Sequence, residues 1–127
     1  MHVALIEKEI TGDIIGAFFE VYNTLGYGFP EFVYSLAMER ELIRRGHKVE
    51  REVSVPIFFK GDLLTNLRAD MIVDGKVVVE NKTGPVLPVT TRLQALSYVK
   101  STRLEVGLVL YFGPEATFFR VVHSNQE

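Results

Sequence analysis

Apolar residues recur at helical spacing in the first third of the chain. Between about residues 7 and 25 they follow one another three or four positions apart, which predicts an amphipathic helix that ends at Gly26. A second helix is expected to about residue 45, because Pro30 suits a first helical position and Glu31 complements the helix dipole. This helix is apolar on two sides, so we expect it to be well buried. Its stripes are Phe32, Val33, Leu36, Ala37 and Ile43 on one side and Tyr34, Met38 and Leu42 on the other.

From residue 53 onward the pattern changes to the alternation that is typical of strands. Every second residue from 53 to 59 is apolar. Pro56 lies within this run and cannot donate to a ladder, so we place the strand at a sheet edge or at a bulge. After a turn at residues 60–62, two apolar runs, 66–73 and 76–82, flank Asp74-Gly75 and predict a β-hairpin.

The remainder of the chain predicts one helix and two strands. Thr90 or Thr91 can cap a helix that continues to about Ser101, and strands are expected over 106–112 and 117–122. A helix in this position allows a right-handed crossover between parallel strands. The predicted fold is therefore α/β, a mixed β-sheet flanked by helices in the order α-α-β-β-β-α-β-β, as a single domain over 1–127.

Composition and charge are those of a globular protein. The chain has 127 residues, of which 47% are hydrophobic and 24% charged, enough for one domain with a sizeable core. The absence of cysteine excludes disulfides and thiolate metal sites and is compatible with a cytoplasmic location. No signal peptide is expected, and no membrane partner, since no apolar run approaches the roughly 20 residues that span a bilayer. The net charge of −2 counts mildly against tight, sequence-independent binding of nucleic acid.

Three charged side chains within the predicted hairpin need an explanation. Asp70 lies on its first strand, and Glu80 and Lys82, two residues apart and so on one face, lie on its second. Charged groups are costly inside an apolar sheet unless they are paired or bound to a metal. A divalent-metal site is one explanation, and an ordinary cross-strand ion pair between Lys82 and an acid is the other.

The loop of the hairpin decides whether these side chains meet. If Asp74-Gly75 forms a two-residue turn, Glu80 points to the opposite side of the sheet from Asp70. If residues 73–75 form a three-residue loop with a bulge, Asp70 faces Val78, and Glu80 shares its face. The metal hypothesis therefore predicts the three-residue loop, or a bulge elsewhere in the hairpin.

Short motifs spread over nearly the whole chain resemble a known family. In chain order they are Gly28-Phe29-Pro30-Glu31-Phe32-Val33-Tyr34, Arg68-Ala69-Asp70, Glu80-Asn81-Lys82, and Gln94 with Tyr98. Together they resemble the GxxExxY family, a branch of the PD-(D/E)xK nuclease superfamily. The chain departs from the pattern at Asn81, where an aliphatic residue is more usual, and at Tyr22, where a histidine is common. The resemblance implies a restriction-endonuclease-like fold.

The resemblance also implies metal-dependent hydrolysis of phosphodiester bonds in DNA or RNA. Mg²⁺ prefers carboxylate and water oxygens, and Asp70 and Glu80 fit that demand, as they would for Mn²⁺. The backbone carbonyl of Asn81 is implied as a further ligand. Lys82 would orient or deprotonate the attacking water, or stabilise the charge that builds on the phosphate.

Four other residues have both a functional and a structural interpretation. Glu31 is implied as an active-site acid, or it only complements the helix dipole, which is worth roughly 0.3–1 kcal/mol. Gln94 and Tyr98 share a helix face; Gln94 would hold water or phosphate, or bond to backbone, and Tyr98 would contact substrate. Arg68 would bind phosphate, or neutralise Glu80 or Glu31.

The three histidines of the chain are not predicted to act in the site. His2, His47 and His123 show no ligand spacing and are predicted at the surface. The leading hypothesis is a small nuclease, and the alternative is a nuclease-fold protein that binds nucleic acid or a protein partner without cleaving. Since no appended domain is expected, the protein could act as a homodimer or with a partner subunit that brings the substrate.

Overall fold

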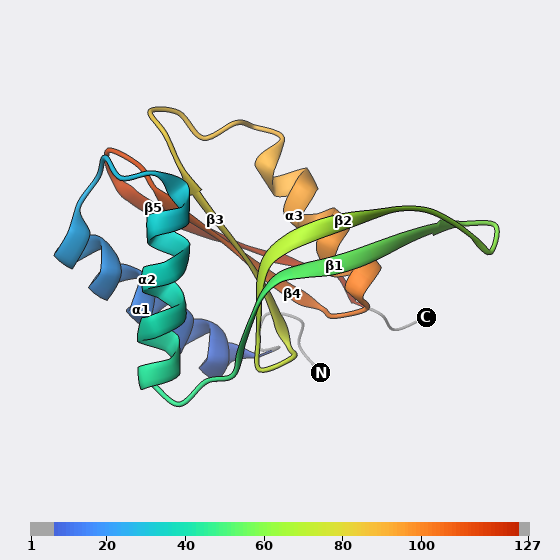
Figure 1. Cartoon of the computed structure of the whole chain (residues 1–127), viewed down its shortest axis with the longest axis horizontal. Coiled ribbons are helices and arrows are strands. Elements are labelled where there is room, and N and C mark those ends of the chain that lie inside the picture. Colours follow the sequence, from blue (N-terminus) through green and yellow to red (C-terminus); the bar gives the residue numbers. More distant parts are fainter. Residues whose placement is uncertain (1–6, 125–127) are drawn as a thin grey trace.

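A five-stranded sheet with helices on both faces forms the molecule (Figure 1). It is seen in a computed structural model, which describes residues 7–124. The helices are α1 (Lys8–Leu25), α2 (Glu31–Arg44) and α3 (Thr91–Thr102). The strands are β1 (Val49–Phe59), β2 (Asp62–Val73), β3 (Val77–Thr83), β4 (Val106–Phe112) and β5 (Ala116–Val122). The predicted α/β class and element order are confirmed.

The strands lie side by side in sequence order, and only β3 and β4 run parallel. The helix α3 makes the predicted crossover between them. The strand β1 forms one edge of the sheet, which agrees with the edge position predicted from Pro56. None of the helices in the described part of the chain is long and apolar enough to cross a bilayer.

The sheet separates two apolar layers. The helices α1 and α2 pack on one face, and α3 packs on the other. Side chains along β3 alternate between them, with Val77 and Val79 on the α1/α2 side and Val78 on the α3 side. The strand β4 is buried along its whole length, as expected for a strand between two helical layers.

The helix α2 is buried on one side only, so the prediction of a helix buried on two sides is wrong. Its stripe of Tyr34, Met38 and Leu42 is fully buried against α1 and the sheet. The other stripe leaves Phe32 64% and Ile43 54% exposed. The reason is that α2 packs against α1, β1 and β3, which all meet the same side of the helix.

The hairpin of β1 and β2 is longer than predicted. Its ladder runs from Val49 opposite Val73 to Phe59 opposite Asp62, so β2 begins several residues before the predicted start at 66. Figure 1 shows the distal part of this hairpin extending past the helices. Because no helix covers it, its apolar residues remain exposed; they are Phe58, Phe59, Leu63 and Leu64.

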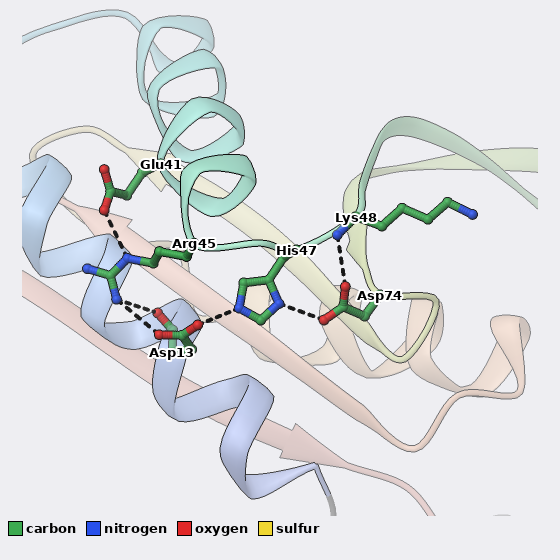
Figure 2. Close-up of polar contacts among 6 residues, drawn as sticks. All are labelled: Asp13, Glu41, Arg45, His47, Lys48 and Asp74. Carbon is green, nitrogen blue, oxygen red and sulfur yellow. Dashed lines mark hydrogen bonds and ion pairs between the residues drawn. The ribbon is translucent and has the colours of Figure 1, made fainter.

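His47 connects three elements of the fold (Figure 2). Its Nδ1 lies 2.6 Å from Oδ2 of Asp74 in the β2–β3 loop, and its Nε2 contacts Asp13 of α1. Arg45 adds a contact of 3.1 Å to Asp13. The hydrogen bond to Asp13 is the main reason why the pKa of His47 is raised. The surface prediction is wrong for this histidine, whose side chain is 13% exposed, and His2 lies outside the described residues.

Candidate active site

The loop between β2 and β3 has three residues, as the metal hypothesis required. The ladder pairs residues 71–73 with 77–79 and leaves 74–76 as the loop. Asp74 and Gly75 both adopt positive φ angles, 55° and 65°. The loop thus starts one residue later than predicted, because Asp74 and Gly75 both occupy the left-handed region and Lys76 completes the turn.

This register moves the two carboxylates directly opposite each other. One pair beyond the ladder, Asp70 meets Glu80 rather than Val78, which was the predicted neighbour. The shift by one full pair leaves the alternation of side chains unchanged within the paired residues 71–73 and 77–79. Asp70 lies beyond this ladder, where the alternation of β2 is interrupted, because Ala69 and Ile72 pack on the α3 side and Met71 on the other. The shared face of Asp70 and Glu80 therefore stays a prediction, and what the structure shows is the hydrogen bond between the two residues.

Beyond this point the strands part, and side chains replace the backbone ladder. The Asp70 N–H donates to Oε2 of Glu80 at 3.0 Å, and the Asn81 N–H donates to Oδ2 of Asp70 at 2.8 Å. Figure 1 shows that β2 and β3 diverge away from the loop that joins them, and their ladder ends at Met71 opposite Val79. Each carboxylate is therefore held by the backbone of the opposite strand, in the fork between the two.

Burial raises the pKa of both carboxyl groups above the ordinary values. Glu80 is only 2% exposed, and burial together with the charge of Asp70 raises its pKa to about 8. Burial also raises the pKa of Asp70, against the opposing effects of the Asn81 N–H and of Lys82. The Lys82 ammonium lies 3.8 Å from Oε1 of Glu80. Both residues belong to β3, so this contact lies within one strand and is not the cross-strand ion pair that was the alternative to a metal site. A divalent cation would favour the charged form of both acids.

The donor set fits a hard divalent cation. Each carboxylate uses one oxygen in the interstrand hydrogen bond, which leaves the second oxygen of Asp70 and of Glu80. Mg²⁺ commonly takes one or two carboxylates and keeps several waters. Within residues 7–124 no three His, Cys, Asp or Glu side chains come together as a ligand group. Water or substrate oxygens would therefore complete the coordination.

The helix α2 brings Glu31 to the same fork. Burial and the charge of Asp70 raise the pKa of Glu31, whereas Lys82 and the backbone of Thr83 lower it. A pocket of about 190 Å³ opens here; it is lined by Glu31, Phe32, Ser35, Arg51, Glu52, Arg68 and Asp70. Glu31 and Asp70 line one pocket, but among residues 7–124 Glu31 does not join Asp70 and Glu80 as a third ligand for one metal ion.

The helix α3 approaches the carboxylates from the other side. Tyr98 is 5% exposed, and burial and then the charges of Glu80 and Asp70 raise its pKa. The exposed Gln94 donates from Nε2 to the Tyr98 hydroxyl at 3.4 Å. Gln94 therefore bonds to a neighbouring side chain here rather than to backbone, and the pair lies beside the acids.

Arg68 has a partner that the sequence did not indicate. Its Nη1 lies 3.1 Å from Oε1 of Glu52 on β1, and both side chains are largely exposed. The predicted ion-pair partners, Glu80 and Glu31, are not the ones it contacts in this arrangement. Glu52 was missed because the pairing of β1 with β2 could not be derived from the spacing within either strand.

Two further polar residues tie the fork to α2. Asn81 is fully buried and donates from Nδ2 to the Ser35 hydroxyl at 3.3 Å, while its Oδ1 has no hydrogen-bond partner.

The Tyr34 ring stacks on Phe112 with centroids 4.3 Å apart, and its hydroxyl donates to the carbonyl of Gly26. Tyr34 thus packs in the core and closes the turn before α2, so that Glu31 begins the helix beside β3.

Comparison with known proteins identifies the class to which this fold and site belong. Residues 8–121 match the family model of the PD-(D/E)XK nuclease superfamily, so the chain belongs to that superfamily. The crystal structure of SSO0001 resembles it in fold, with a TM-score of 0.59 and 24% identity over 74% of this chain. The match spans 50% of the SSO0001 chain. No curated protein matches the sequence. The superfamily is confirmed, and the GxxExxY branch stays a prediction.

Proposed function

We propose that this nuclease-superfamily protein hydrolyses phosphodiester bonds in DNA or RNA with a divalent metal ion. The observation that carries the proposal is the convergence of Asp70 and Glu80 at the fork, each held by a backbone N–H of the opposite strand. Membership of the PD-(D/E)XK nuclease superfamily supports the same chemistry. The GxxExxY motifs remain the basis for the finer family assignment.

In this proposal Asp70 and Glu80 hold Mg²⁺ or Mn²⁺. The ion, when bound, supplies an acidified water and charge stabilisation for the phosphate. Lys82, whose ammonium lies 3.8 Å from the Glu80 carboxylate, orients the attacking water or meets the charge that develops on the phosphate. Glu31, which shares the pocket with Asp70, accepts or relays a proton at its carboxylate.

The remaining predicted residues act on the substrate. Gln94, bonded to Tyr98 beside the acids, holds a water or a phosphate oxygen. Tyr98 contacts the substrate from the α3 side. Arg68 lines the pocket and offers its guanidinium to a phosphate, in exchange for its exposed partner Glu52.

Metal titration followed by a cleavage assay tests the proposal. Calorimetry should detect Mn²⁺ binding to the wild type and its loss in Asp70→Ala, while Glu115→Ala, an exposed acid outside the site, binds normally. Glu80→Gln should lower the rate of hydrolysis at least about 100-fold, because the second ligand is lost. Unchanged hydrolysis in Glu80→Gln would contradict the mechanism. Binding of nucleic acid by the wild type without any product would favour the non-cleaving alternative.

A further inference from the structure

Phe32 presents an aromatic ring to solvent at the edge of the candidate site. It follows Glu31 directly in α2, is 64% exposed, and lines the same pocket as Glu31 and Asp70. A single exposed apolar residue is ordinary on a protein surface. An aromatic ring in the wall of a charged pocket is different, because it offers a flat apolar surface next to the proposed reacting groups.

The cations of this pocket are already paired with acids. Arg51 Nε lies 3.2 Å from Glu39, and Arg68 Nη1 lies 3.1 Å from Glu52. Glu31 and Asp70 line the same pocket. Binding of duplex DNA relies heavily on lysine and arginine contacts to phosphates. Because three acids and two arginines line the pocket and the chain charge is −2, the pocket offers little of that attraction to a duplex.

The size of the pocket and its aromatic wall favour a single flat group. Its volume of about 190 Å³ is below the about 300–1,000 Å³ that encloses a drug-sized ligand. Unpaired bases expose planar faces that stack on aromatic side chains, whereas bases in a duplex stack on one another.

We infer that the substrate is an unpaired nucleic-acid strand, one base of which stacks on Phe32. This inference rests on the proposed function and names its substrate class. Stacking would hold the strand beside the carboxylates without requiring a dense cationic surface. It does not distinguish DNA from RNA, because every base has a planar face.

A single-tryptophan variant tests the inference directly. The chain contains no tryptophan, so in Phe32→Trp the fluorescence reports on this position alone. Unpaired DNA or RNA strands, with Ca²⁺ in place of Mg²⁺, should quench that fluorescence. A strand of abasic residues and a duplex should not. Ile43→Trp places the probe on the same exposed stripe of α2, outside the pocket, and should be quenched by none of them.

Fluorescence anisotropy measures how much stacking on Phe32 contributes to the affinity for unpaired strands. Phe32→Ala should weaken binding of unpaired strands about 5- to 150-fold, the range for loss of one stacked base, and Phe32→Trp should restore it. Ile43→Ala should bind like the wild type. Circular dichroism confirms that the variants are folded, which the exposure of Phe32 leads us to expect. Because stacking alone does not separate DNA from RNA, the affinities of the DNA and RNA strands are compared to show whether the protein prefers one of them.

Two results would overturn the inference. One is equal affinity of the wild type for duplex and unpaired strands; the other is a Phe32→Ala effect that is absent or is the same for the abasic strand. If Mn²⁺ binding and Glu80-dependent hydrolysis persist alongside either result, only the inference fails. If base stacking on Phe32 is found but no strand is hydrolysed with Mn²⁺, the proposed function fails instead.

Discussion

Glu80 connects the candidate site to the stability of the fold. In the folded protein its pKa is about 8, against 4.5 for an ordinary glutamate. The folded state therefore keeps a proton that the unfolded chain releases between these pH values. Stability that is fully present below pH 4.5 is lost as the pH rises through about 8. The full difference corresponds to roughly 4–5 kcal/mol of unfolding free energy.

Glu80→Gln should remove this pH dependence, because glutamine carries no proton that titrates. We expect the wild type to lose several kcal/mol of unfolding free energy between about pH 5 and pH 8, and the variant to lose much less. Urea unfolding in a chelating buffer measures both. Parallel pH profiles for the two proteins would show that Glu80 does not titrate in this window.

His47 makes a second pH-dependent contribution to stability. Its pKa is also raised, but by partners that favour its charged form, whereas burial disfavours the charged form of Glu80. Its pKa is raised above 6.5 mainly by the hydrogen bond to Asp13, so its ion pairs stabilise the fold below pH 6.5 and weaken as the pH rises through the raised value. The pKa values of Asp13 and Asp74 are lowered, with His47 as the common cause, so their contribution is lost only in stronger acid.

Substitution of His47 should therefore matter most in mild acid. We expect His47→Gln to destabilise the protein by about 1 kcal/mol near pH 5 to 6 and by less at pH 9, since partly exposed ion pairs are individually weak. Urea unfolding at these pH values tests this, and His123→Gln, which lacks these carboxylate partners, is the control. An effect that grows with pH would contradict the assignment.

At the scale of elements, one buried polar contact connects β3 to α2. Asn81 and Ser35 share a hydrogen bond of 3.3 Å inside an otherwise apolar layer. A buried donor without a partner costs about 1–3 kcal/mol, whereas replacing both partners with apolar groups is nearly neutral. The contact therefore contributes to the alignment of α2 with the fork more than to stability.

We expect Ser35→Ala to destabilise the fold by about 1–3 kcal/mol, because it leaves the Asn81 amide unpaired. The double variant Ser35→Ala/Asn81→Leu should recover most of this loss. Urea unfolding of the single and double variants gives the comparison. A neutral Ser35→Ala, or a double variant less stable than the single one, would refute this interpretation of the contact.

The elements also show where sequence patterns stop being informative. Alternation within β2 and β3 predicted that Asp70 and Glu80 share a face, because within a regular ladder a side chain's face depends only on the parity of the register. The two residues do meet, through the hydrogen bond from the Asp70 N–H to Glu80, but they lie just beyond the regular ladder. The first residue of the loop was predicted one position too early, because the sequence did not show that Asp74 as well as Gly75 takes a positive φ angle. Which stripe of α2 enters the core could not be derived, since both are apolar; the stacking of Tyr34 on Phe112 settles it.

At the scale of the whole molecule, the site lies where the layers meet. Helix α2 reaches the fork from one face of the sheet and α3 from the other, and both contact β3. The order of elements along the chain and the parallel crossover were predicted from the sequence, whereas the order of the strands within the sheet was not. The contacts of Arg68 with Glu52 and of His47 with Asp13 were not, because they join segments that no local pattern relates.

The proposed hydrolysis depends on Asp70 and Glu80 binding one divalent cation. A crystal of the protein grown with Mn²⁺ and measured for anomalous scattering tests this most directly. We predict one peak within coordination distance of both carboxylates, and its absence in Asp70→Ala. A peak elsewhere, or none at the fork of β2 and β3 while the wild-type carboxylates keep their present positions, would contradict the account.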